Sequence, residues 1–251
     1  MSLPNQVDVV IVGGGVMGTS AAFHLAEAGI SVLLCEKNEL ASGSTSKAAG
    51  GVRANFSDEF NVALGARSLD LFAKFNQRPG YEIDLHRSGY LFALSKSEDV
   101  TLFEKSTQIH KKFGVESRML TPAEAGKISP LLNTSDLLAC SFTPNDGHCT
   151  PEAVVLGYGG GAKKLGATIL TNTQVTSITV DNGEITSVQT TAGNVKTNTV
   201  INCAGAWSPQ IAAMVGLELP VTPYRRELVI TEALGDNFAD LPKSMPMTID
   251  Y

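Results

Sequence analysis

The chain has 251 residues, of which 43% are hydrophobic and 18% are charged, and its formal net charge is −6 at pH 7. This composition is typical of a globular protein with room for one large domain or two modest ones. The acidic balance, without any block of Lys or Arg, argues against nucleic acid or an anionic membrane surface as a partner. No apolar stretch reaches the ~20 residues of a membrane span, and the N-terminus lacks a signal-peptide pattern, so a cytoplasmic protein is expected.

Residues 7–37 predict a nucleotide-binding strand–helix–strand unit. Val7–Val12 is a nearly continuous apolar run of mostly β-branched residues, as in a strand buried within a parallel sheet. A helix is expected over residues 16–28, with its N-terminus facing bound phosphates. The turn before it has the pattern G-x-G-x-x-G, which gives a tight turn, close approach of a pyrophosphate, and close packing of helix on strand. The glycines of this pattern are Gly13, Gly15 and Gly18.

A second strand, Ser31–Cys35, leads into Glu36. A carboxylate at this place accepts hydrogen bonds from an adenosine ribose and repels a 2′-phosphate. The alternative is an ordinary Gly-rich turn with Glu36 merely solvated at a strand end. The coincidence of strand, glycines, helix, strand and acid in this order favours a dinucleotide site.

Residues 37–53 are dense in Gly, Ser and Ala, and their side chains are too small to pack a core. One interpretation is a flexible surface loop. The other is a cradle in which small side chains and backbone N–H groups lie against a flat ligand.

The first glycine turn, the acid after the second strand, and a G-S-T-x-x-A-A-G-G segment running into Arg53 together resemble the FAD-dependent amine oxidoreductases of the D-amino-acid-oxidase superfamily. The glycine oxidase and sarcosine oxidase branch is the most similar, including the β subunits of heteromeric sarcosine oxidase and proline dehydrogenase. The resemblance implies an α/β chain, with a Rossmann-type three-layer FAD-binding domain and a smaller antiparallel-sheet α+β substrate domain.

By the same resemblance, Arg53 lies where sarcosine oxidases hold the substrate carboxylate, although a phosphate or backbone contact is the alternative role. Lys47 stands where the dimethylglycine-dehydrogenase-like branch has a flavin-linked His, so non-covalent FAD is expected. The cofactor-binding residues implied in this region are Lys37, Ser44, Thr45, Lys47, Ala48, Ala49, Gly50 and Gly51.

The middle of the chain predicts helices and strands of a second domain. A helix over residues 57–77 is expected to bury Phe60, Leu64, Leu71, Phe72 and Phe75. Thr121 with Pro122 is a helix start, with Thr121 as the cap. The other expected elements are strands Glu82–His86 and Gly89–Ser95, a charged helix over 96–113, strand Leu137–Thr143 and a turn over 144–148.

A helix from Pro151 to Lys164 carries several glycines in its interior: Gly157, Gly159, Gly160 and Gly161. Each interior glycine costs about 0.5–1 kcal/mol relative to Ala. Either the helix packs very closely on a neighbour, or it is broken around Tyr158.

Strands are then expected over residues 167–171, 174–180 and 184–191, with a hairpin turn at 181–183. Val175 lies where the family pairs backbone with adenine. Thr199–Cys203 is expected as a buried strand, a helix follows over 209–217, and strands over 219–231 and from residue 246 close the chain. The segment A-G-A-W-S at 204–208 is very similar to the family's segment beneath the cofactor, which implies contacts from Ala204, Gly205 and Trp207. Core packing is the alternative for Trp207.

The expected FAD-binding domain comprises residues 1–81 and 150–217, and the substrate domain comprises 82–149 and 218–251. Members of this family continue well beyond the point that corresponds to Tyr251. The sequence is therefore expected to be a C-terminally truncated form that binds FAD weakly and turns over poorly.

The reaction implied by the resemblance is FAD-dependent oxidation of a small primary or secondary amino acid, by hydride transfer to flavin N5 to give an imine. Alternatives are an FAD-dependent 2-hydroxy-acid or glycerol-3-phosphate dehydrogenase, a non-catalytic flavin-binding subunit, and, least favoured, an NAD dehydrogenase. The expected partners are a small amino-acid substrate and either a second copy of the chain or the other subunits of a heteromeric oxidoreductase. Neither the cysteines nor the histidines have metal-ligand spacing, so no metal site is predicted.

Overall fold

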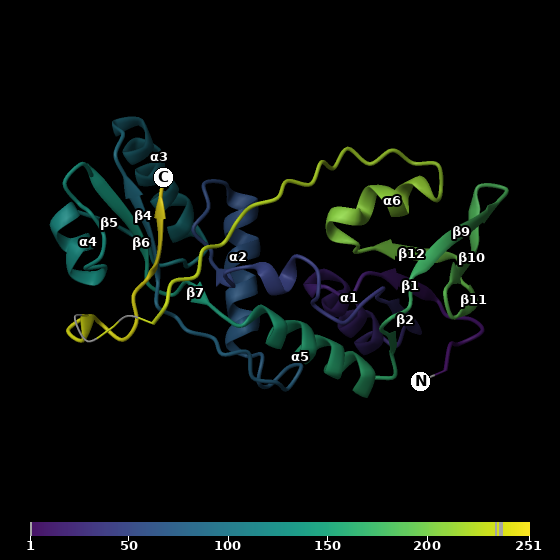
Figure 1. Cartoon of the computed structure of the whole chain (residues 1–251). Coiled ribbons are helices and arrows are strands. Elements are labelled where there is room, and N and C mark those ends of the chain that lie inside the picture. The colour runs from purple at the N-terminus through teal and green to yellow at the C-terminus, as the bar shows by residue number, and fades with distance from the viewer. Residues whose placement is uncertain (1, 234, 236–237) are drawn as a thin grey trace. The chain divides into compact units, whose positions relative to one another are not determined.

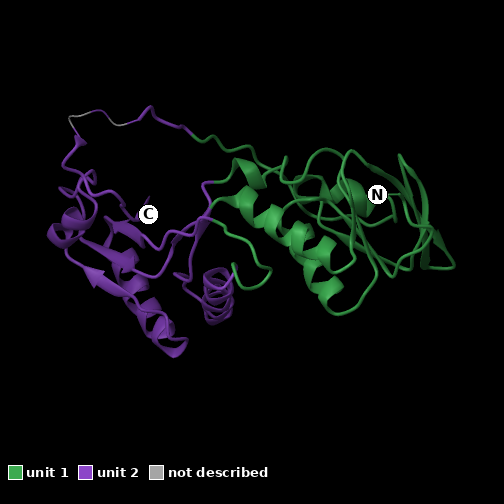
Figure 2. Cartoon of the chain, turned by 90° about the horizontal axis from the view of Figure 1, so that it is seen from below, with its two compact units in different colours: residues 1–48, 76–83, 150–228 green, residues 49–75, 84–149, 229–251 purple. Residues whose placement is uncertain are grey.

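The computed structural model describes residues 2–233, 235 and 238–251. The chain divides into two compact units, each built from separate stretches of sequence (Figure 2). Unit 1 contains residues 1–48, 76–83 and 150–228, and unit 2 contains residues 49–75, 84–149 and 229–251. Both combine helices and sheets, which confirms the expected α/β class. Residues 49–75 lie in compact unit 2, whereas the sequence places them in the FAD-binding domain. The domain boundaries expected from the sequence stay a prediction.

Unit 1 is built on a four-stranded parallel sheet in the order β12-β1-β2-β8, with a separate antiparallel sheet in the order β11-β10-β9 (Figure 1). Its elements are β1 (Val9–Val12), α1 (Val16–Glu27), β2 (Val32–Cys35), the 3₁₀ turn η1 (Thr45–Lys47), α5 (Pro151–Lys164), β8 (Thr168–Leu170), β9 (Val175–Asp181), β10 (Glu184–Thr190), β11 (Gly193–Lys196), β12 (Thr199–Asn202), the 3₁₀ turn η2 (Gly205–Trp207) and α6 (Ser208–Ala213).

The core of unit 1 has three layers because β1 and β2 are buried on both faces. Successive side chains of a strand point to opposite faces of the sheet. Val10 and Leu33, on one face, pack in a single cluster with Ile178 and Val188 of the antiparallel sheet. Helices α1 and α5 pack against each other and contact the parallel sheet. The predicted three-layer architecture is therefore present.

Helix α5 is continuous, so its glycines reflect close packing and not a break. A Cβ atom on Gly161 would lie 2.7 Å from Pro79 Cβ and 2.9 Å from the Phe23 ring, and a Cβ on Gly160 would overlap the Tyr81 hydroxyl. Phe23 belongs to α1. The glycines thus let α5 approach α1 and residues 79–81, which resolves the alternative that the sequence left open.

Unit 2 contains a four-stranded sheet in the order β13-β4-β6-β5 and a short antiparallel pair, β3 with β7. Strand β13 runs parallel to β4, and the other pairs are antiparallel. Its elements are β3 (Gly51–Val52), α2 (Glu59–Ala73), β4 (Tyr90–Leu94), α3 (Ser97–Lys112), β5 (Arg118–Leu120), α4 (Pro122–Ile128), β6 (Ala139–Thr143), β7 (Gly147–His148) and β13 (Met247–Asp250).

The side chains on the two faces of strand β4 belong to two different hydrophobic clusters of unit 2. Leu91 packs in one cluster with Ala125 of α4, and Phe92 packs in the other with Phe103 of α3. Helix α4 begins with a complete capping box, in which Thr121 Oγ1 accepts from the Glu124 N–H and the Glu124 carboxylate accepts from the Thr121 N–H. The predicted start of this helix is confirmed.

The predicted buried face of α2 is wrong. Phe60 is 75% exposed and Leu64 is 52% exposed, whereas Val62, Gly65 and Leu69 are buried. A Cβ on Gly65 would lie 2.8 Å from both Ala54 Cα and the Arg53 carbonyl oxygen. The glycine allows the helix to press this face onto the backbone, so Phe60 and Leu64 lie on other faces of the helix. Leu71 is also exposed, while Phe75 is buried as predicted.

Two predicted strands do not form. Residues 82–86 contribute only an isolated bridge between His86 and His148, because Asp84 has a φ of 54° and leaves the extended conformation. Residues 219–231 form no helix or strand. Pro220 and Pro223 lack the N–H groups that a sheet ladder needs.

Strand β12 forms where a buried strand was predicted, but it is not buried. Val200 and Ile201 are half-buried, and Thr199 and Asn202 are exposed. Within the part of the chain that the structure describes, β12 pairs with β1 alone and is the edge of its sheet. Strand β11, by contrast, was not predicted, since its sequence has no strong apolar alternation.

Among the helices that the structure describes, none has the length and apolar composition needed to cross a membrane.

Candidate functional site

The glycine turn of unit 1 lies between β1 and α1, as predicted. Gly13 has a φ of 112°, a conformation that L side chains rarely adopt. A Cβ on Gly13 would overlap the Cys203 carbonyl oxygen, and one on Gly18 would overlap the Gly13 carbonyl oxygen. These glycines therefore allow a tight turn and bring the first turn of α1 against both parallel strands β1 and β12.

The N-terminus of α1 has features that favour binding of an anion. Gly15 at the cap position provides no side-chain hydrogen bond, and the first turn carries no acidic residue. The Val16 N–H donates a long hydrogen bond to Thr45 Oγ1 at 3.3 Å, which brings the second small-residue segment beside the glycine turn. Free N–H groups and the helix dipole at such a terminus favour a phosphate.

Glu36 follows β2 and is half-buried beside the same turn. Its Oε2 accepts from the Gly14 N–H at 2.7 Å, and its Oε1 accepts from the Asn38 N–H at 2.9 Å. Each carboxylate oxygen can accept a further hydrogen bond. The carboxylate is thus oriented by backbone and retains acceptor capacity for a hydroxyl pair such as that of a ribose.

The A-G-A-W-S segment also reaches this turn. Ala204 Cα would lie 3.1 Å from a Cβ on Gly13, and Gly205 has a φ of 55°. Trp207 is 39% exposed as a whole residue, so core packing does not account for it. Lys37 Nζ lies 3.8 Å from the centre of that ring, in cation–π geometry.

The other predicted cofactor residues of unit 1 lie on the surface or in the core. Ser44, Lys47 and Ala48 are exposed around η1. Val175 is 3% exposed, and its side chain packs in the core cluster between the two sheets. An interaction of Val175 with a nucleotide would therefore have to use its backbone.

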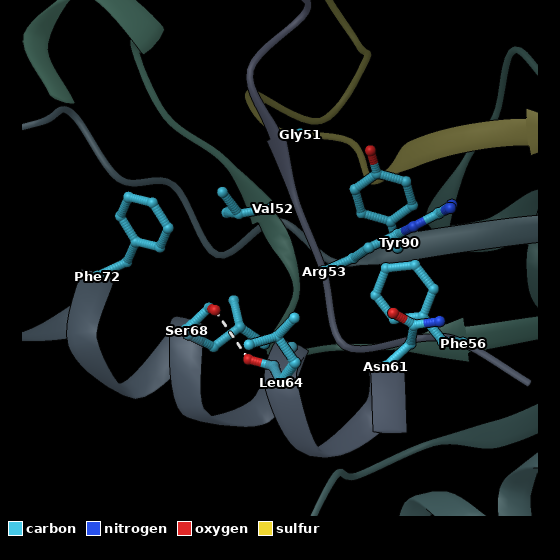
Figure 3. Close-up of a pocket in the computed structure, with 11 residues that line it drawn as sticks. Gly51, Val52, Arg53, Phe56, Asn61, Leu64, Ser68, Phe72 and Tyr90 are labelled. Carbon is cyan, nitrogen blue, oxygen red and sulfur yellow. Dashed lines mark hydrogen bonds between the residues drawn. The ribbon is translucent and has the colours of Figure 1, made fainter. Parts of the chain in front are cut away.

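The remaining predicted residues, Ala49, Gly50, Gly51 and Arg53, belong to unit 2. Gly51 pairs with His148 in the β3–β7 ladder, and a Cβ on Gly51 would overlap the Tyr90 hydroxyl. A cavity of about 310 Å³ opens beside them (Figure 3). Its walls are largely apolar and come from the β3 segment, α2 and β4, with Gly51, Val52, Arg53, Phe56, Asn61, Leu64, Gly65, Ser68, Leu69, Phe72 and Tyr90 as lining residues.

Arg53 lies in this cavity among aromatic rings. Its guanidinium carbon is 4.9 Å from the centre of the Phe56 ring, 5.2 Å from that of Phe92 and 5.6 Å from that of Tyr90. Within the described part of the chain, Arg53 forms no ion pair with a carboxylate. Burial raises the pKa of Tyr90, and the positive charge of Arg53 acts in the opposite direction. The arrangement presents a half-buried cation in an apolar cavity, which suits a small carboxylate.

Two buried polar residues, Asp146 and His110, bind the backbone next to Arg53 and were not predicted from the sequence. Asp146 is 1% exposed, and its carboxylate accepts hydrogen bonds from the Ala54 and Asn55 N–H groups. His110 is 0% exposed and contacts the Phe56 carbonyl oxygen. Asp146 was interpreted as part of a turn, and no motif in the sequence distinguishes it from other turn residues.

Comparison with known proteins agrees with this geometry. The model of the family described as FAD dependent oxidoreductase (DAO) matches residues 8–251. Dimethylglycine dehydrogenase of Homo sapiens mitochondria is 31% identical over 248 residues, which is 98% of this chain and 28% of that protein. Glycine oxidase of Geobacillus kaustophilus is 30% identical over 239 residues, which is 92% of this chain and 63% of that protein.

Among solved structures, L-proline dehydrogenase from P. horikoshii superimposes with a TM-score of 0.81 at 38% sequence identity. The match covers 86% of this chain and 57% of that chain. The chain therefore spans little more than a quarter of the dimethylglycine dehydrogenase and somewhat more than half of the proline dehydrogenase.

Proposed function

The chain belongs to the family of FAD-dependent oxidoreductases, and from this premise we propose that it oxidises a small primary or secondary amino acid of the glycine, sarcosine or proline type. Bound FAD would supply the electron acceptor, because oxidised flavin takes a hydride at N5 from the carbon next to the amine nitrogen. The product would be an imine, which water hydrolyses.

Unit 1 would hold the ADP half of FAD. The first N–H groups of α1 and the Thr45 hydroxyl would bind the pyrophosphate, and the Glu36 carboxylate would accept from the ribose hydroxyls. Lys37 and Trp207, in contact with each other, would lie at the edge of this site. A 2′-phosphate would be repelled by Glu36. The donors and acceptors present in unit 1 therefore fit FAD.

The single observation that carries the substrate class is the environment of Arg53. A guanidinium among three aromatic rings, without a carboxylate partner among the described residues, is available to bind the substrate carboxylate through two parallel hydrogen bonds. Ala49, Gly50 and Gly51, which precede Arg53, would lie along the flavin ring. Ser44, Lys47 and Ala48 would be the other residues of that cofactor segment, with FAD bound non-covalently.

An FAD-dependent 2-hydroxy-acid dehydrogenase is the second candidate, because such a substrate also carries a carboxylate that Arg53 would bind. The names of the relatives, which act on amines or amino acids, favour the first candidate. A cytoplasmic location and assembly with partner subunits remain predictions from the sequence.

The test begins with the visible spectrum and a substrate panel of glycine, sarcosine, N,N-dimethylglycine, L-proline and their hydroxy-acid counterparts. The protein should carry flavin that acid precipitation releases into the supernatant. Arg53→Ala should raise the KM for the amino acid at least about tenfold, a loss of ~1.4 kcal/mol, with the flavin content retained. Arg67→Ala, on the exposed side of α2, is the control. An unchanged KM in Arg53→Ala would contradict the role of Arg53.

A further inference from the structure

Two buried titratable side chains, Asp146 and His110, bind the backbone of the segment that carries Arg53. Neither residue is among those that line the cavity beside Arg53. Asp146 Oδ1 accepts from the Ala54 N–H at 3.0 Å, and Oδ2 accepts from the Asn55 N–H at 3.3 Å. The two residues that follow Arg53 are therefore bound by one carboxylate. Charged acceptors form stronger hydrogen bonds than neutral ones, so this contact fixes the backbone direction at Ala54.

Asp146 is itself held rigidly. Thr143 Oγ1 donates to Asp146 Oδ2 at 2.7 Å, and the Gly89 N–H donates to the Asp146 carbonyl oxygen at 2.8 Å. The side chain is 1% exposed. Burial raises the pKa of this carboxyl, and the hydrogen bonds from Thr143, Ala54 and Asn55 oppose that shift. The carboxylate is thus a buried acceptor with donors from Thr143, Ala54 and Asn55.

His110 binds the same segment one residue further along, at the carbonyl group of Phe56. Its Nε2 lies 2.8 Å from the Phe56 carbonyl oxygen, and its Nδ1 lies 2.8 Å from Ser117 Oγ. Because a carbonyl oxygen only accepts, Nε2 must carry the hydrogen. In the neutral ring Nδ1 then accepts from the Ser117 hydroxyl, and burial, which lowers the pKa of His110, favours this neutral form.

Helix α2 presses on the same segment from another side. A Cβ on Gly65 would lie 2.8 Å from the Arg53 carbonyl oxygen, so there is no space into which this backbone could move toward the helix. Residues 53–56 are therefore held by a carboxylate, an imidazole and a helix backbone. From this held segment the side chains of Arg53 and Phe56 enter the cavity (Figure 3).

We propose that Asp146 and His110 are positioning residues, which hold the backbone of residues 54–56 so that the Arg53 guanidinium binds the carboxylate of an amino-acid substrate. The inference rests on the proposed function, since it acts through Arg53. Neither residue is required to touch substrate. Their effect is on binding of the carboxylate, and the chemical step is left unchanged.

The experiment compares each substrate with its own amide in the FAD-loaded protein with its whole chain. The probes are the amino acid of the panel that the protein oxidises best and its carboxamide, which lacks the negative charge. Asp146→Asn keeps the size of the side chain. It replaces the two charged oxygens, which accept from the Ala54 and Asn55 N–H groups, with one neutral oxygen and one NH₂ group that cannot accept. Asp70→Asn, an exposed carboxylate on α2, is the matched control.

Asp146→Asn should raise the KM for the amino acid about tenfold or more, because the released backbone at Ala54 and Asn55 no longer holds the Arg53 guanidinium in place, while kcat and the KM for the amide stay within about threefold. Asp70→Asn should change neither. Thr143→Val, which removes one donor and keeps the carboxylate, should shift the amino-acid KM in the same direction by a smaller factor. It serves as the second variant if Asp146→Asn does not fold.

Equal KM increases for the amino acid and its amide, or a fall in kcat alone, would overturn the positioning role. The Arg53→Ala variant separates this failure from failure of the proposed function. If Arg53→Ala leaves the ratio of the two KM values unchanged, both proposals fall. If Arg53→Ala changes the ratio and Asp146→Asn does not, only the positioning role is lost.

Discussion

Glu36 Oε2 accepts a hydrogen bond from the Gly14 N–H at 2.7 Å, so the carboxylate at the end of β2 is fixed against the glycine turn at the end of β1. Replacing Glu36 with Ala removes both this contact and the acceptor for a ribose. We expect FAD binding to weaken by about 10–100-fold, because hydrogen bonds to a charged group contribute ~1.5–3 kcal/mol. Titration of apoprotein with FAD, followed by flavin fluorescence, measures the change.

Glu39→Ala is the control for this variant, because Glu39 is a nearby carboxylate that accepts a hydrogen bond from the Asn172 side chain. Its FAD affinity should equal that of the unaltered protein. An equal loss in both variants would point to general disturbance of the turn and would contradict a ribose-binding role for Glu36.

The parts of the fold that sequence analysis predicted correctly are those with a local cause. The β-branched run before Gly13, the Thr121 cap and the turn at Asn182 and Gly183, which have φ values of 51° and 84°, each depend on a few neighbouring residues. A hairpin turn with two positive φ values is the one that Asn-Gly favours. Such signals can be interpreted without knowing what packs on them.

The errors and omissions have a long-range cause. The buried face of α2 is decided by contact of Gly65 with the backbone at Ala54, a contact that the helical spacing of Phe60 and Leu64 does not indicate. The hydrogen bond from Ala54 to Asp146 joins residues 92 positions apart. The rings around Arg53 come from Phe56, near Arg53 in sequence, and from Tyr90 and Phe92 of the distant strand β4. Nothing in the local sequence of Asp146 or Phe92 indicates these contacts.

Two glycines of α5 should respond to the same substitution with opposite signs. A Cβ on Gly161 would lie 2.7 Å from Pro79 Cβ and 2.9 Å from Phe23, whereas a Cβ on Gly159 would have no neighbour closer than 3.4 Å, at Leu40. Gly161→Ala should lower the free energy of unfolding by about 1–3 kcal/mol through overpacking. Gly159→Ala should raise it by up to about 1 kcal/mol through helix propensity.

Urea unfolding followed by circular dichroism measures both glycine variants. Because the two positions lie on one helix and both are buried, each serves as the control for the other. Stabilisation by both substitutions would contradict the close packing of α5 against residues 23 and 79.

The capping box of α4 gives a third prediction. Thr121 Oγ1 accepts from the Glu124 N–H, and the Glu124 carboxylate accepts from Thr121. The hydrogen bonds that the Glu124 carboxylate accepts from the Thr121 N–H and the Thr121 hydroxyl lower the pKa of Glu124. Thr121→Ala should reduce the free energy of unfolding of unit 2 by about 0.5–2 kcal/mol, whereas Thr121→Ser keeps the acceptor and should be close to neutral. Equal stability of the Ala and Ser variants in urea would exclude a contribution from the cap.

The stability of the protein should depend on pH through His110. Burial lowers the pKa of His110 in the folded state, and its contacts with the Phe56 carbonyl and the charge of Asp146 offset part of that shift. The unfolded chain therefore binds this proton more readily than the folded protein. The free energy of unfolding should fall as the pH drops below about 6.5, the pKa of an unperturbed His, and should continue to fall until the pH reaches the lower folded value.

Asp146 changes the stability in the opposite direction at lower pH. Because its pKa is raised in the fold, the folded state binds this proton before the unfolded chain does, and the free energy of unfolding rises as the pH falls.

The contribution of His110 is separated from that of Asp146 by comparison with His110→Gln, whose amide can still donate to the Phe56 carbonyl. Between pH 7 and the lower folded pKa of His110, the unaltered protein should lose stability with a slope of at most about 1.4 kcal/mol per pH unit, and His110→Gln should lose less. His86→Gln, at an exposed position, is the control. Identical pH profiles for the unaltered protein and His110→Gln, measured by urea unfolding, would show that folding does not lower the pKa of His110.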